Sequence, residues 1–129
     1  MSSKDKFEEF KEKYPNLFKE YPRSGFYLGS GWEKLVHNLC ELLDHHIKHL
    51  PEEISKNISV AQVKEKFGGL RFYMTVEDEF IRGAVALAEH LSYSLCEECG
   101  AIGQRRGGSY ILTLCDTHYQ EREEKKGKK

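Results

Sequence analysis

The fold is decided by a segment near the middle of the chain, residues 59–76, whose sequence is SVAQVKEKFGGLRFYMTV. On both sides of Gly68 and Gly69, apolar residues alternate with polar ones, which is the period of a half-buried strand. Two successive glycines readily supply the positive φ angles of a tight turn. The segment therefore predicts a β-hairpin that turns at Gly68-Gly69.

A symmetric turn at these glycines predicts the residues that face each other across the hairpin. The apolar face would hold the pairs Phe67 with Leu70, Glu65 with Phe72, Val63 with Met74, and Ala61 with Val76. The opposite face would hold the pairs Lys66 with Arg71, Lys64 with Tyr73, and Gln62 with Thr75.

The second of these faces is a candidate binding surface. A like-charge pair such as Lys66 and Arg71 is mildly unfavourable unless solvent or a bound anion screens it. The candidate residues are Lys64, Lys66, Arg71 and Tyr73, extended by Arg105 and Arg106. They could hold phosphates or acidic side chains, whereas the simpler interpretation is a solvated face whose lysines block pairing with other strands.

Helical periodicity flanks the hairpin on both sides. Before it, a helix is predicted from Trp32 to Leu50, with Trp32 in the core. After it, acidic residues 77–79 and Thr75 as a cap predict the start of a second helix that runs into Cys96. The buried stripe of that helix is predicted to be Phe80, Ile81, Ala84, Leu87, Ala88, Leu91 and Leu95.

The amino-terminal segment, residues 1–24, is charged and rich in aromatic residues, and two prolines interrupt it. We interpret it as an arm of short helical pieces whose apolar side chains pack on the body. These side chains are Phe7, Phe10, Tyr14, Leu17, Phe18 and Tyr21. The predicted organisation is this arm, an α+β core over 25–95, a zinc-binding module over 96–120 and a charged tail over 121–129.

Four residues near the carboxyl end form the strongest signal in the chain, with the spacing C-x2-C-x15-C-x2-H. They are Cys96, Cys99, Cys115 and His118. Thiolate and imidazole ligands suit Zn²⁺, and four of them complete its tetrahedral shell without leaving a position for a reactive water. We therefore expect one structural zinc ion.

The residues around these ligands predict a treble-clef-like module. Gly100 follows the second cysteine, where a knuckle needs a left-handed residue. Gly107-Gly108 can turn a hairpin whose second strand includes Tyr110, and residues 115–126 predict a helix with two ligands in its first turn. Cys40 is interpreted as a small buried hydrophobe. The pair His45 and His49, with Glu41 one turn earlier, is interpreted as a solvated helix face.

Composition limits the remaining function classes. The 129 residues include 20 Lys and Arg against 21 Asp and Glu, a formal net charge of −1, so any basic site must be local. The longest apolar run, residues 84–88, is too short to span a bilayer, and no apolar leader begins the chain. We expect a cytoplasmic protein without a membrane partner. No common hydrolase or nucleotide-binding motif is present, so an enzyme is not expected.

Residues 62–73, QVKEKFGGLRFY, together with CEECG at 96–100, TLCDTH at 113–118 and Gly31-Trp32, resemble a family of small uncharacterised proteins encoded mainly by bacteriophages and prophages. The resemblance covers about residues 25–118. It implies a phage accessory protein with a zinc module in a bacterial host cell, and it implies no reaction.

Three functions remain open at this point. The first is a non-enzymatic protein that binds a host or phage protein and inhibits a bacterial defence system. The second is a nucleic-acid-binding zinc protein that uses the basic hairpin face. The third is a metal-dependent enzyme of unrecognised type.

Overall fold

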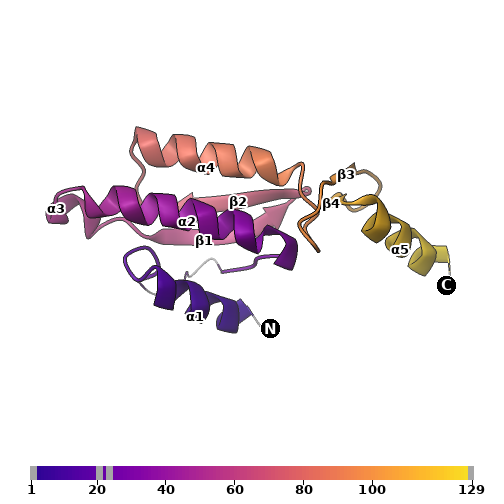
Figure 1. Ribbon diagram of the computed structural model, residues 1–129, viewed down its shortest axis with the longest axis horizontal. Helices are drawn as coiled ribbons and strands as arrows, with labels where there is room; N and C mark the ends of the chain where they lie inside the picture. Colours follow the sequence, from indigo (N-terminus) through magenta and orange to yellow (C-terminus); the bar gives the residue numbers. More distant parts are fainter. Residues whose placement is uncertain (1–2, 20–21, 23–24, 128–129) are drawn as a thin grey trace.

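The computed structural model describes residues 3–19, 22 and 25–127, and it shows a mixed helix and strand architecture (Figure 1). A β-hairpin carries helices on one side, and a small module of two strands and a helix lies at one end. The predicted α+β class is confirmed. No helix within the described ranges is long and apolar enough to cross a membrane.

The central hairpin consists of β1 (Val60–Lys66) and β2 (Gly69–Met74), which pair antiparallel. Its turn is one residue earlier than predicted, at Phe67 and Gly68, whose φ angles are 53° and 79°. Gly69 begins the second strand instead. The Tyr93 ring packs on it so closely that a Cβ there would lie 2.6 Å from the ring. A contact from a distant part of the chain therefore positions the turn.

The predicted cross-strand pairs are consequently wrong. The observed pairs are Val60 with Met74, Gln62 with Tyr73, Val63 with Phe72, Lys64 with Arg71, Glu65 with Leu70, and Lys66 with Gly69. From Gln62 to Lys66 each partner shifts by two residues, which keeps the alternation of the two faces there. The register is irregular between Val60 and Gln62, so Val60 rather than Ala61 joins the buried face. Phe67 and Val76, which were predicted on the apolar face, are exposed.

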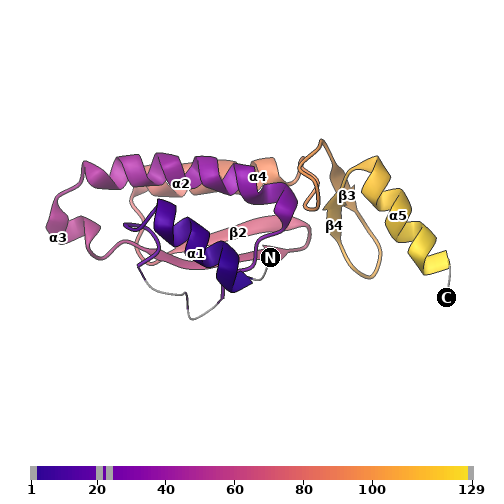
Figure 2. The same cartoon turned by 60° about the horizontal axis from the view of Figure 1, so that its bottom comes forward.

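Helices α2 (Glu33–Lys48) and α4 (Glu79–Ser92) lie together on one side of the hairpin (Figure 2). A single 3-10 turn, η1 (Ser30–Trp32), leads into α2, and the short α3 (Glu52–Ser55) follows it. Trp32 is buried, as predicted, and its indole Nε1 donates to the carbonyl of Leu95 at 2.9 Å.

The amino-terminal aromatic residues belong to this core. Helix α1 (Ser3–Lys13) and the residues after it bury Phe7, Phe10, Tyr14, Leu17 and Phe18, which confirms that they pack on the body. Phe7 and Phe18 meet edge to face with ring centroids 5.9 Å apart. Tyr21 lies outside the described residues.

Helix α4 differs from its prediction in its cap and in its buried side. Asp78, rather than Thr75, caps the helix by accepting a hydrogen bond from the amide of Ile81. The helix ends at Ser92, so three residues, Tyr93, Ser94 and Leu95, separate it from Cys96. Its buried residues are Ile81, Val85, Ala88 and Ser92, whereas Phe80, Leu87 and Leu91 of the predicted stripe are 44–60% exposed.

Side chains of α4 also occupy the outer edge of β2. Ser92 Oγ accepts a hydrogen bond from the amide of Leu70, and Glu89 Oε2 accepts one from the amide of Phe72, each at 2.9 Å. On the other side of the hairpin, Tyr27 donates its amide to the carbonyl of Val63. The hairpin is thus held by hydrogen bonds along both sides.

Candidate metal centre

The first two candidate ligands lie in a tight turn a few residues after α4. The amide of Cys96 donates to the carbonyl of Ala101, and the amide of Gly100 donates to the carbonyl of Cys96, both at 2.8 Å. Gly100 has a φ of 81°, and a Cβ there would lie 2.8 Å from the carbonyl oxygen of Gly31. Glycine is therefore required at this position by both its backbone conformation and the close approach of η1.

The other two ligands follow a small hairpin of β3 (Gln104–Arg106) and β4 (Leu112–Leu114). Cys115 lies between β4 and helix α5 (Asp116–Gly127), and His118 lies in the first turn of that helix. The amide of His118 donates to Cys115 Sγ at 3.4 Å. The second strand starts at Leu112 rather than at the exposed Tyr110.

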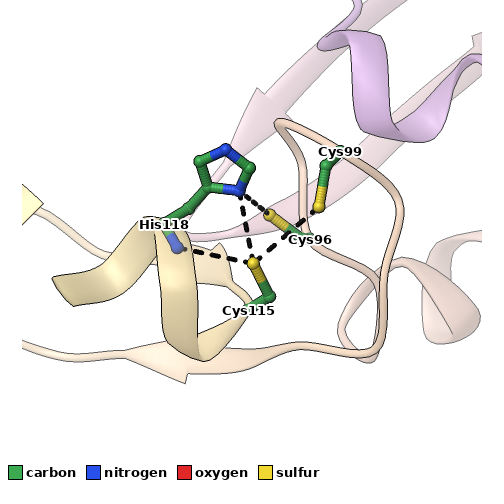
Figure 3. Close-up of side chains that lie close together, drawn as sticks. All are labelled: Cys96, Cys99, Cys115 and His118. Carbon is green, nitrogen blue, oxygen red and sulfur yellow. Dashed lines mark hydrogen bonds between the residues drawn. The ribbon is translucent and has the colours of Figure 1, made fainter. Parts of the chain in front are cut away.

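These elements bring the four candidate ligands together (Figure 3). One ligand atom from each residue lies within 4.8 Å of the others. Sγ of Cys99 and Cys115 are 3.8 Å apart, and His118 Nδ1 is 3.5 Å from Cys96 Sγ and 3.2 Å from Cys115 Sγ. Cys96, Cys99, Cys115 and His118 thus lie close enough to bind a metal ion.

The spacing can be compared with a tetrahedral zinc site. Zn–S bonds of about 2.3 Å and a Zn–N bond of about 2.0 Å place two sulfurs about 3.8 Å apart and a sulfur and nitrogen about 3.5 Å apart. The three separations given above have these values within a few tenths of an ångström, and the four ligand atoms together lie within 4.8 Å. The cluster is compatible with zinc.

Electrostatics favour the ligating form of Cys115. The amide of His118, followed by the side chains around the thiol, lowers the pKa of Cys115 to about 7, which favours the thiolate that binds metal. Since Nδ1 of His118 faces the sulfurs, its Nε2 points outward, 3.7 Å from a carboxylate oxygen of Glu98 and 4.0 Å from one of Glu121. Carboxylates beside the distal nitrogen orient a ligating histidine.

The cluster is firmly connected to the α+β core. The amide of Gly31 donates to the carbonyl of Glu97 at 2.9 Å. Glu97 in turn accepts a hydrogen bond from the amide of Thr113, and the hydroxyl of Thr113 donates to the carbonyl of Gly68. These links from η1 and from the hairpin turn fix the position of the cluster relative to the core.

The remaining cysteine and the histidine pair lie elsewhere. Cys40 is fully buried in α2, and burial raises the pKa of its thiol well above the usual range, as expected of an inert core residue. His45 on α2 and His49 directly after this helix are exposed, and His49 Nδ1 lies 2.8 Å from the carbonyl oxygen of His45. They form no cluster with Glu41 among the described residues.

The six candidate residues of the basic surface separate into two groups. Lys64, Lys66, Arg71 and Tyr73 share the outer face of the hairpin, with Lys64 opposite Arg71. Arg105 reaches the turn of the same hairpin by donating two hydrogen bonds to the carbonyl of Phe67, at 2.8 and 3.2 Å.

Arg106 instead belongs to the carboxy-terminal module. Its guanidinium pairs with Asp116 at 2.7 Å and lies over the Tyr119 ring, 4.4 Å from the centroid. Its side chain is only 13% exposed. It therefore packs β3 against α5 and does not extend the hairpin face.

Sequence reasoning missed two features near these surfaces. Phe67 is exposed at the hairpin turn with a positive φ. Considering a turn at Phe67-Gly68 as well as at Gly68-Gly69 would have placed it there. Glu97 and Thr113 connect the cluster to the core, and no local pattern marks them.

In three comparisons, no family model, no curated protein and no solved structure matches this chain.

Proposed function

We propose that this chain is a small non-enzymatic binding protein whose carboxy-terminal module is folded around one structural zinc ion. The spacing of the four ligand atoms within 4.8 Å supports the metal. Three thiolates and an imidazole favour zinc over harder cations. The order of knuckle, hairpin and ligand-bearing helix supports a treble-clef-like arrangement.

A structural role follows from the ligand count. Four protein ligands complete a tetrahedral shell, whereas catalytic zinc ions keep one position for water or substrate. Two of the ligands lie in the knuckle and two at the start of α5, so the ion joins segments that share little apolar core of their own. The metal would stabilise the fold and take no part in a reaction.

The observation that carries the binding function is an exposed apolar stripe on α4, formed by Phe80, Leu87 and Leu91. Leu87 and Leu91 follow Phe80 by seven and eleven residues, which are nearly two and three helical turns, so the three side chains project to the same side. They are 45%, 60% and 44% exposed, and Leu42 on the neighbouring α2 is 47% exposed. Exposed apolar side chains gathered on one side of a helix favour a protein interaction site.

The partner of this stripe would be a protein with an apolar surface of its own. The resemblance to phage-encoded proteins supports an accessory role in an infected bacterium. Inhibition of a host defence system is the role that this resemblance favours, and it depends on the resemblance alone.

The test is affinity capture by the zinc-loaded full chain from bacterial extracts made with and without phage infection. Leu87→Glu should lose a partner that the unchanged protein captures, because it places a charge at the centre of the stripe. Ile54→Glu is a matched control, since Ile54 is a comparably exposed apolar residue (48%) on a different helix, α3. Equal capture by both variants would remove the α4 stripe as the binding surface.

A further inference from the structure

The outer face of the β1–β2 hairpin combines exposed aromatic rings with cations. We define the aromatic-cationic face as Lys64, Lys66, Phe67, Arg71 and Tyr73. Phe67 is 56% exposed and Tyr73 is 43% exposed. The Lys64 ammonium lies 5.9 Å from the centroid of Tyr73, and that of Lys66 lies 5.7 Å from the centroid of Phe67. Each ring therefore has a positive charge beside it.

The backbone conformation of Phe67 indicates that the fold does not require phenylalanine at this position. Among the described residues it is the one non-glycine residue with a positive φ, 53°. A bulky residue is disfavoured in this conformation, and two-residue hairpin turns prefer asparagine, aspartate or glycine. Burial does not offset the strain, because more than half of the side chain is exposed. Strained residues that the fold does not need are candidates for function.

The charges of the face point to an anionic ligand. Lys64 lies opposite Arg71, and like charges in this position repel unless an anion or solvent screens them. At the turn, Arg105 adds a fourth cation, since its guanidinium is held on the carbonyl of Phe67 and lies 4.6 Å from the centroid of the Tyr93 ring. Positive charge thus extends along the hairpin from Lys64 to Arg105.

We propose that the aromatic-cationic face binds single-stranded nucleic acid. Unpaired bases would stack on Tyr73 and Phe67, and phosphates would contact Lys64, Lys66 and Arg71, which is how sequence-tolerant single-strand sites are built. A duplex hides the faces of its bases from such rings. An acidic peptide would use the cations but would leave the two exposed rings unexplained. The proposal is independent of the α4 stripe, because strand alternation places Arg71 and Tyr73 on the side of β2 away from the core.

The binding test uses the zinc-loaded full chain with fluorescein-labelled dT12, rU12 and a twelve-base-pair duplex, followed by anisotropy over a salt series. Both single strands should bind more tightly than the duplex, and their affinity should fall as salt rises. No affinity for dT12 or rU12 at low salt would overturn the proposal. A duplex that binds as tightly as the single strands would also overturn it.

The decisive variant is Phe67→Asn, because asparagine tolerates the turn conformation that strains phenylalanine. The variant should be at least as stable as the unchanged protein, yet lose affinity for dT12 roughly 5- to 150-fold, the effect of removing one stacking platform. Tyr110→Thr is the matched control, since Tyr110 is 60% exposed in the loop between β3 and β4. Equal losses in the two variants would refute a role for Phe67.

The cations have a corresponding test. Lys64→Glu should weaken binding and reduce the salt slope by about one, as expected for the loss of one phosphate contact. Lys126→Glu on α5 is the matched control and should leave both quantities unchanged. A poly-glutamate peptide that competes with dT12 at equal charge concentration would show that the face selects acidic peptides, and would overturn the assignment to nucleic acid.

Discussion

The side-chain hydroxyl of Thr113 donates a hydrogen bond to the backbone carbonyl of Gly68, and both residues are buried. The bond joins strand β4, which directly precedes the ligand Cys115, to the turn of the central hairpin. The metal module and the α+β core therefore share a buried polar contact.

Thr113→Val keeps the shape of this side chain and removes its hydroxyl, which leaves the carbonyl of Gly68 without that partner. We expect the free energy of unfolding to fall by about 1–3 kcal/mol. Urea denaturation measures the change. Thr117→Val, at an exposed position of α5, serves as the control and should have little effect. An equally small effect at Thr113 would mean that the contact contributes nothing to stability.

Elemental analysis of the untagged protein should find one zinc per chain. Cys115→Ser should release the metal and increase amide exchange over residues 96–120, because the metal stabilises this segment. Cys40→Ala should retain the full zinc content, since Cys40 is buried in α2. Equal zinc loss in the two variants would show that the ligands are wrongly assigned.

The observed hairpin register makes a stability prediction of its own. Lys64→Glu replaces the repulsive pair with Arg71 by an attractive one, whereas Lys66→Glu faces Gly69 and gains no cross-strand partner. The first variant should exceed the second in unfolding free energy by about 0.2–1 kcal/mol. Thermal and urea unfolding in low salt measure the difference. The reverse order would favour the register with Lys66 opposite Arg71.

Stability should also fall in mildly acidic solution because of His37. Its ring stacks on Phe10 at 4.1 Å, and burial, followed by the charge of Lys13, lowers its pKa below 6.5 in the folded protein. The unfolded chain then binds more protons in this range, so the free energy of unfolding decreases as the pH falls from about 6.5 through the folded pKa.

Urea unfolding between pH 7.5 and 5 checks this prediction. His37→Gln removes the titrating group and should flatten the pH dependence, while the metal ligands remain the same in both proteins. The same slope in the variant would assign the acid sensitivity to other groups.

The metal ligands could be predicted from sequence because their spacing is local within each pair, and chelation requires both pairs together. Trp32 could be predicted as a core residue because it begins a long helical period. The hairpin turn could not be placed, since local preference favours Gly68-Gly69 over the observed Phe67-Gly68. The packing of the Tyr93 ring on Gly69, 24 residues away in the chain, decides between them.

The buried side of α4 was equally ambiguous in the sequence. Residues 80, 84, 87 and 91 are apolar with a helical period, and so are 81, 85 and 88. The second set lies in the core and, of the first set, only Ala84 packs against it, because Glu89 and Ser92 bond to the edge of β2. The amides at the edge of β2 need hydrogen-bond partners, and this need therefore orients the helix. A pattern of hydrophobic residues does not show it.

These two hydrogen bonds have a consequence for how the protein meets other chains. An exposed strand edge is a template on which further strands can add, and it leads to aggregation or to β-sheet extension by a partner peptide. Glu89 and Ser92 already occupy the amides of Phe72 and Leu70 that such a strand would need. The central hairpin is therefore protected against polymerisation through β2, and its partners are selected by side chains rather than by backbone pairing along that strand.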